Sequence, residues 1–229
     1  MDGLATLFQR YNVLGAFWTT IQLTVWGALG ALVIGTVVAI CRVSPVSVLQ
    51  RFGAAYVTLI RNTPLTLIVA FCSLGISNTL KVHLAPGDSS TFIVDNGFRW
   101  AAVALAVYHA SFVAEAIRSG INTVPKGQAE AARSIGLGFG PTLQHVVLPQ
   151  AFRGAIAPLG NTLIALTKNT TVAATVGVAE AAYMMYNMIE FDGSLLYWIF
   201  FIMATGFVIL TLPIGLLFTW LSNRLAVDR

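Results

Sequence analysis

One acidic side chain stands in a short segment of small residues, between two of the long apolar stretches of the chain. Glu130 is followed by Ala131 and Ala132, and Gly136 and Gly138 come shortly afterwards. The alanines favour a helix, and the two glycines favour its end. Small residues let another backbone approach closely. The segment could therefore make a polar contact with a partner protein, or it could be an ordinary surface helix with a solvated Glu130.

Covalent chemistry has no support in the sequence. The run Gly136-x-Gly138-x-Gly140 is not a phosphate-binding loop, because no strand precedes it and no Gly-Lys-Ser/Thr follows. We find no Walker A sequence, no Ser-His-Asp set and no metal-ligand cluster. Cys41 and Cys72 stand in apolar stretches without the spacing of a zinc site. The sequence thus predicts no enzyme, no metal site and no cofactor bound by this chain.

The composition indicates a membrane protein. Of the 229 residues, 57% are hydrophobic and only 10% are charged, and the mean hydropathy is +0.79. A soluble domain usually has about 25% charged residues. A soluble enzyme and a disordered protein are therefore excluded. The net charge of +4 is spread between apolar runs, so it does not indicate nucleic-acid binding.

The positions of the apolar runs predict how the chain is organised. A membrane-spanning helix needs about 20 apolar residues. We expect an all-α polytopic membrane protein that forms one permease domain over residues 1–229. The five predicted spans are approximately 15–41, 56–79, 98–118, 150–173 and 195–222. Between the last two, Ala179–Asp192 is expected to form a short interfacial or re-entrant helix.

The basic residues predict the orientation. Nine of the 13 Lys and Arg residues fall on the side that holds the segment around Glu130 and the C-terminus. The positive-inside rule places that side in the cytoplasm and the N-terminus outside.

Four ionisable residues fall within or beside predicted spans, where a charge at the bilayer centre costs about 2.5–3.5 kcal/mol or more. Each could line a substrate pathway, and each has a plainer alternative. Lys168 could reach the interface, and Arg61 could cap a span. His109 could bond a neighbouring helix, and Glu115 could pair with Arg118 three residues later. Polar residues of the fourth span could bond between helices or line the path: Asn161, Thr162, Thr170 and Thr171.

Several motifs resemble one known family. Glu130-Ala-Ala, Gly136 and Val146–Pro149, at these spacings, resemble the EAA motif of bacterial ABC-importer permeases. Further segments resemble the polar amino acid branch of that family, over residues 15–223 as a whole: Arg61-Asn-Thr63-Pro-Leu65, Glu115–Ile121, Pro125–Gln128, Leu148–Ala151 and Asn161–Thr171. Within the branch, the chain is most similar to glutamate-uptake permeases of Gram-positive bacteria.

The resemblance implies the fold and the partners. The fold would be the transmembrane domain of an ABC type I importer in a bacterial plasma membrane. Two ATPase subunits would bind ATP and Mg, a second permease would complete a heterodimer rather than a homodimer, and an extracellular binding protein would deliver the amino acid. A coupling helix at about 126–138 would dock on the ATPase through Gly127, Gln128, Glu130, Ala131, Ala132, Gly136, Leu137 and Gly138.

The resemblance also suggests a substrate. Many relatives carry Asp after the residue that corresponds to Lys168, whereas this chain has Asn169. The loss of that negative charge fits an anionic substrate such as glutamate. The expected substrate pathway comprises Lys168, Asn169, Thr170, Asn161, Arg61, Thr63, His109 and Glu115. An ion-coupled secondary amino acid transporter is the alternative, although such folds usually have more spans and inverted repeats.

Overall fold

The computed structural model describes residues 2–225, and this part of the chain forms helices without any strand. The all-α prediction is confirmed. The α-helices are α1 (Asp2–Arg10), α2 (Val13–Val43), α3 (Ser47–Arg61), α4 (Leu65–Ala70), α5 (Phe92–Ile121), α6 (Lys126–Ser134), α7 (Phe139–Thr142), α8 (Leu148–Asn169), α9 (Ala181–Phe191) and α10 (Leu196–Arg224). Two π-helical segments, η1 (Phe71–Thr79) and η2 (Leu143–Val147), continue α4 and α7, and two 3-10 segments, η3 (Thr170–Val176) and η4 (Gly193–Leu195), flank α9.

Within residues 2–225, three helical segments are long and apolar enough to cross a membrane: α2, α5 and Gly193–Arg224, which contains α10. A fourth candidate arises if Ser47–Arg61 and Leu65–Thr79 count as one broken span. The helix over the fourth predicted range, α8, is not among these candidates. It contains Arg153 and Lys168 and a Pro at position 158, which makes it less apolar than α2 or α10.

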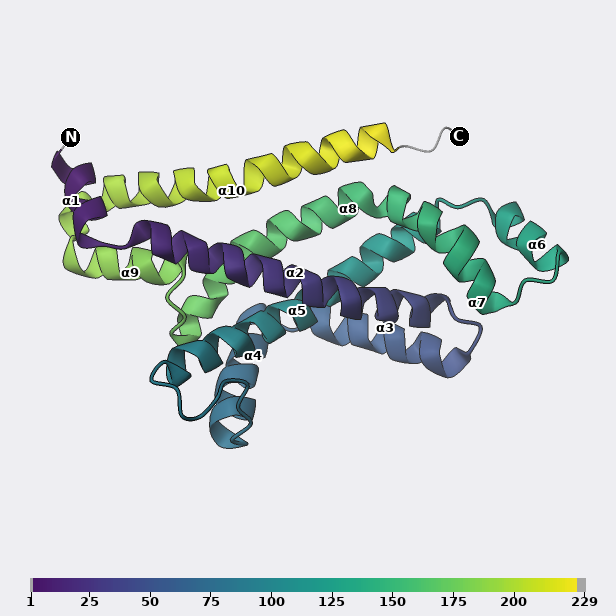
Figure 1. The fold of residues 1–229 in the computed structure, drawn as a ribbon, viewed down its shortest axis with the longest axis horizontal. Helices are drawn as coiled ribbons and strands as arrows, with labels where there is room; N and C mark the ends of the chain where they lie inside the picture. Colours follow the sequence, from purple (N-terminus) through teal and green to yellow (C-terminus); the bar gives the residue numbers. More distant parts are fainter. Residues whose placement is uncertain (1, 226–229) are drawn as a thin grey trace.

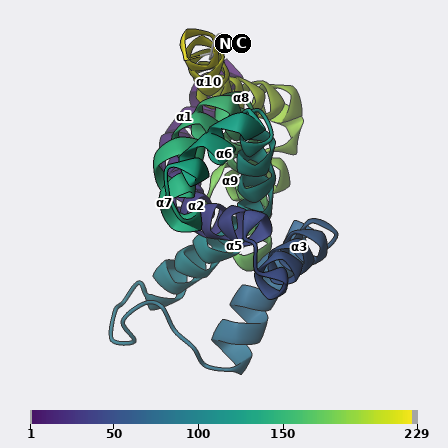
Figure 2. The same ribbon diagram turned by 90° about the vertical axis from the view of Figure 1, so that its right-hand side faces the viewer.

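The second predicted span, 56–79, is wrong as one continuous helix. The chain bends by 101° between Ser47–Arg61 and Leu65–Thr79. Pro64 stands at the N-cap of α4 with an extended backbone, ψ 134°. Proline lacks a backbone N–H and disfavours a helical residue before it, so α3 ends and α4 starts afresh. Figure 2 shows the α4 segment leaning away from the rest of the bundle.

The centre of the bundle is the crossing of α2 and α5 (Figure 1). Small residues bring the two backbones together. A Cβ atom added at Gly30 would lie 2.7 Å from the Cβ of Ala106, and one added at Gly35 would lie 2.6 Å from the Cβ of Val113. Close packing of this kind, rather than the hydrophobic effect, holds helices together in lipid.

Short helices lie at the two ends of the longest axis of the molecule (Figure 1). One end holds α1 and α9, where Asp192 accepts hydrogen bonds from Arg10 at 2.9 Å and from Tyr11 at 2.6 Å. The other end holds α6 and α7. Helix α9 occupies the segment between the last two predicted spans, as expected. Helix α10 starts beside α1 and runs toward the α6 end without reaching it (Figure 1).

Candidate functional site

Helix α6 is a short amphipathic helix at the end of the bundle. Ala132 is 5% exposed and faces the protein. On the other side Gly127, Glu130 and Ala131 are exposed. The Gln150 side chain of α8 donates a hydrogen bond of 2.7 Å to the side-chain oxygen of Gln128. This bond and the burial of Ala132 fix α6 so that Glu130 points away from the bundle.

The predicted coupling segment, 126–138, is a helix only as far as Ser134. Gly136 has a φ of +92°, a left-handed conformation that favours glycine. The N–H of Gly136 then bonds the Arg133 carbonyl, and the N–H of Leu137 bonds the Ala132 carbonyl. The side chain of Ile135 is 80% exposed at this turn. The sequence analysis did not single out Ile135, because an apolar residue beside a helix end does not by itself show whether it is buried.

Three of the predicted pathway residues lie in one chain of contacts. The Arg61 guanidinium lies over the ring of Phe112, 4.9 Å from its centroid. The Phe112 and His109 ring centroids are 6.0 Å apart. His109 in turn contacts Asn169, whose side-chain nitrogen lies 3.1 Å from Nε2. The fold thus connects the ends of α3 and α8 through one face of α5.

The hydrogen bonds of His109 define its tautomer. Nδ1 lies 3.0 Å from the carbonyl oxygen of Leu105, so Nδ1 carries the proton and donates. Nε2 is then the acceptor for the Asn169 amide. The imidazole is 1% exposed. His109 therefore has the plainer role that the sequence left open, a histidine bonded to neighbours, and it orients Asn169.

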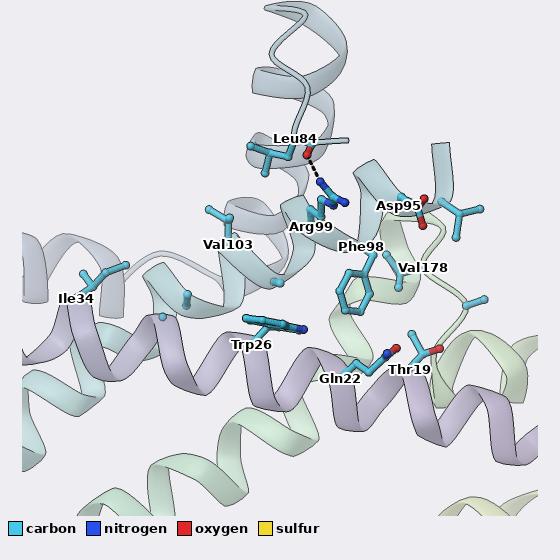
Figure 3. A pocket seen from close by; sticks show the side chains of 15 residues that line it. Thr19, Gln22, Trp26, Ile34, Leu84, Asp95, Phe98, Arg99, Val103 and Val178 are labelled. Carbon is cyan, nitrogen blue, oxygen red and sulfur yellow. Dashed lines mark hydrogen bonds between the residues drawn. The ribbon is translucent and has the colours of Figure 1, made fainter. Parts of the chain in front are cut away.

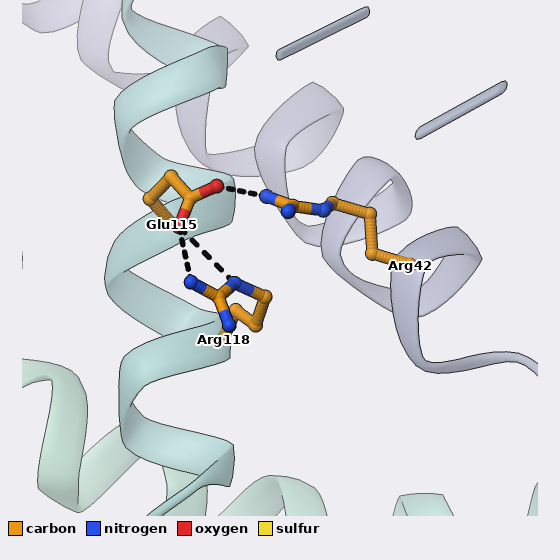
Figure 4. Close-up of polar contacts among 3 residues, drawn as sticks. All are labelled: Arg42, Glu115 and Arg118. Carbon is orange, nitrogen blue, oxygen red and sulfur yellow. Dashed lines mark hydrogen bonds and ion pairs between the residues drawn. The ribbon is translucent and has the colours of Figure 1, made fainter. Parts of the chain in front are cut away.

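Glu115 is paired on both carboxylate oxygens (Figure 4). Arg118 donates to Oε2 through Nε at 3.1 Å and Nη2 at 2.9 Å. Arg42, from the last turn of α2, donates to Oε1. The expected pairing with Arg118 is confirmed, whereas Arg42 was not foreseen. These bonds join the end of α2 to α5, and both carboxylate oxygens of Glu115 take part in them.

The other predicted pathway residues are spread over different surroundings. Lys168 is exposed, and Thr170 is fully buried and bonds the carbonyl of Thr167. The Thr63 hydroxyl bonds the carbonyl of Leu59. Asn161 lines a separate cavity of about 510 Å³ between α8 and α10. The fold does not gather all eight residues into one site.

A cavity of about 780 Å³ lies between α2 and the first half of α5 (Figure 3). None of the eight predicted pathway residues lines it. Its polar groups are Thr19 and Gln22 on α2 and Asp95 and Arg99 on α5. Arg99 donates to the carbonyl of Leu84, and Asp95 accepts a 2.6 Å bond from Thr91. Sequence reasoning missed this cavity because only the packing of α5 on α2 creates it.

Glu180 is a fully buried carboxylate at the N-cap of α9, outside the candidate spans. Its two oxygens accept hydrogen bonds from the backbone N–H groups of Ala182 and Tyr183 at 2.9 and 3.0 Å. The neighbouring N–H of Ala181 bonds the Thr20 hydroxyl of α2 at 3.2 Å. Burial raises the pKa of Glu180 to about 7, although the two N–H groups oppose this rise.

This pKa predicts a pH-dependent stability. Because the ordinary pKa is 4.5, the folded protein binds the Glu180 proton more tightly than the unfolded chain. The contribution of Glu180 to stability is thus full below pH 4.5 and is lost as the pH rises to about 7. Thermal unfolding in detergent across this range will measure it, and Glu180→Gln is expected to flatten the slope. An unchanged slope in that variant would assign the pH dependence to other groups.

Comparisons with known proteins agree with this architecture. The glutamate transport system permease protein GluC of Corynebacterium glutamicum is 55% identical over 218 residues, which cover 95% of this chain and 96% of the relative. The L-cystine transport system permease protein TcyB of Bacillus subtilis is 36% identical over 72% of this chain and 66% of its own length.

A solved structure shares the fold. The crystal structure of an amino acid ABC transporter with histidines superposes with a TM-score of 0.80 at 23% identity, covering 98% of this chain and 99% of that one. The transmembrane domain of ABC type I importers is therefore the fold of this chain. The family model for the binding-protein-dependent transport system inner membrane component matches residues 31–227. The chain belongs to this family of inner membrane components.

Proposed function

We propose that this chain is the permease subunit of an ATP-driven importer that carries glutamate into the cytoplasm by alternating access. The observation that carries the proposal is α6, a helix held at one end of an apolar bundle with Glu130 directed outward. A surface helix with an exposed acidic residue, small neighbours and an exposed Ile135 suits docking by another protein. Rigid-body movement of the docked partner can then rock the bundle.

The partners follow from this role. The chain has no ATP-binding motif of its own, so two ATPase subunits, holding ATP and Mg, would dock on α6 and on its counterpart in a second permease. We favour a heterodimer of permeases and an extracellular binding protein that delivers the substrate. The α6 end then faces the cytoplasm of a bacterial cell and the α9 end faces outward, in agreement with the distribution of basic residues.

Glutamate is supported by similarity and by charge. The relative named for glutamate is 55% identical to this chain, and the one named for cystine is 36% identical. Lys168 is exposed beside Asn169 at the end of α8. A cation without an adjacent carboxylate suits an anionic substrate. Arg61 is a second cation, and it is connected to Asn169 through the rings of Phe112 and His109.

Reconstituted transport tests the proposal. The permease, its ATPase and a second permease are placed in liposomes, and labelled glutamate uptake is followed with the binding protein outside. Uptake should require ATP inside and should persist when ionophores remove the ion gradients. Uptake that follows an ion gradient without ATP would instead support the secondary transporter.

Asn169→Asp tests the substrate assignment. The new carboxylate cannot donate to Nε2 of His109, and it adds a negative charge beside Lys168. We expect glutamate uptake to fall roughly tenfold, the effect of about 1.4 kcal/mol, and uptake of a basic amino acid to appear in a competition assay. Asn169→Ser is the control for loss of the amide alone. Unchanged glutamate uptake in Asn169→Asp would remove residue 169 from the pathway.

A further inference from the structure

A groove of about 580 Å³ lies beneath α6, on the side that faces the bundle. Its other walls are the turn after α2, the start of α3, the last turn of α5, the turns before and after α6, helix α7 and the π-helical segment η2. The groove therefore lies at the level where the long apolar helices α2 and α5 end. It contains none of the expected substrate-pathway residues.

Helix α6 contributes three residues to the groove. Lys126, Ala129 and Arg133 line the groove. They are spaced three and four residues apart and therefore share one face of the helix. Gly127 and Glu130 are exposed and do not line the groove. Glu130 follows Lys126 by four residues and precedes Arg133 by three, so it borders the groove rather than lying on the opposite face of the helix.

The chemistry of the groove is that of a site for an anionic amphiphile. Its walls are mostly apolar, with Val43, Ile121, Leu143 and Val147 among them, and two cations, Lys126 and Arg133, come from α6. Among the residues that the structure describes, no acidic side chain lines it. Two cations attract an anionic headgroup, whereas an apolar wall beside the ends of α2 and α5 accommodates an acyl chain. A small polar anion such as an amino acid would leave the apolar walls without a partner.

We propose that this groove binds one anionic phospholipid, with its phosphate between Lys126 and Arg133 and an acyl chain against the ends of α2 and α5. The lipid would link α6 to the turn after α2 and so hold the docking helix at the membrane surface. This site goes beyond the proposed transport function and does not depend on it, because lipid binding can be measured without transport.

Native mass spectrometry of the purified permease complex provides the test. Phosphatidylglycerol and phosphatidylcholine are added in detergent, and the lipids retained per complex are counted. We expect preferential retention of one phosphatidylglycerol. The double variant Lys126→Gln/Arg133→Gln should retain it roughly thirty-fold more weakly, since each basic residue near an anionic lipid contributes about fivefold.

Two further variants make the result specific. Arg51→Gln/Arg153→Gln removes the same charge from exposed positions that do not line the groove, and it should retain the lipid as the unmodified protein does. Ala129→Trp keeps both cations and fills the groove, and it should lose the lipid. Equal retention of the two lipids, equal losses in both double variants or full retention in Ala129→Trp would each overturn the proposal. Complete displacement by glycerol phosphate would also overturn it, in favour of a site for a soluble phosphate.

Discussion

Glu130→Lys is expected to abolish glutamate uptake while the protein still reaches the membrane. Glu130 is exposed on α6, and its carboxylate accepts no hydrogen bond from the described part of its own chain, although its backbone carbonyl accepts one from the Ser134 hydroxyl. A charge reversal there disturbs docking rather than folding. The loss of a docked charge contact costs about 2 kcal/mol or more, which weakens binding of the ATPase roughly thirty-fold. Co-purification of the ATPase with the tagged permease and labelled uptake in cells are the two measurements.

A matched reversal on the opposite end of the molecule separates docking from general charge effects. Glu190 is exposed on α9, far along the longest axis from α6 (Figure 1). Glu190→Lys should retain the ATPase at the level of the unmodified protein. Normal uptake and normal co-purification in Glu130→Lys would show that Glu130 is only a solvated residue. The docking role of α6 would then be rejected.

Gly35→Leu should cause a large loss of stability in the bundle. A Cβ atom at this position would lie 2.6 Å from the Cβ of Val113 and 2.8 Å from the backbone carbonyl oxygen of Ala110. The carbonyl cannot move without shifting α5. Overpacking typically costs about 1–3 kcal/mol, and we expect the upper part of that range. The apparent unfolding temperature and the yield of monodisperse protein in detergent should both fall.

Gly87→Leu is the control: it adds the same leucine side chain at a position without close packing. Gly87 has no atom within 4 Å of an added Cβ and lies in the connection before α5. Leucine there should leave the unfolding temperature nearly unchanged. If Gly35→Leu unfolds at the same temperature as Gly87→Leu, then α2 and α5 can separate at little cost, and the crossing is not the rigid centre of the bundle.

Local features of the sequence were enough to predict a helical membrane bundle and the short helix α6. Apolar runs between charged residues predicted helices over the ranges of α2, α5, α8 and α10, because burial in lipid depends on composition along the chain. The alanines before Gly136 predicted a short helix, and Gly136 is indeed left-handed. The i, i+3 spacing predicted the pair of Glu115 with Arg118, since such residues share a helix face.

Contacts between distant residues required the tertiary structure. Arg42 joins Glu115 across 73 positions, and Asn169 joins His109 across 60. No local periodicity encodes these pairs, because they depend on how α2 and α8 pack on α5. The size of the bend after α3, 101°, also required the structure, because Pro64 indicates a break in the helix but not its angle.

Helix α6 also shows which features the local sequence predicts and which depend on the tertiary structure. Sequence reasoning selected Glu130 and its small neighbours, because an acidic residue among alanines stands out. It could not show that Lys126 and Arg133 turn toward a groove formed with the ends of α2 and α5. The helix itself is determined by adjacent residues, whereas the groove beside it also needs the turn after α2, some 80 residues earlier in the chain.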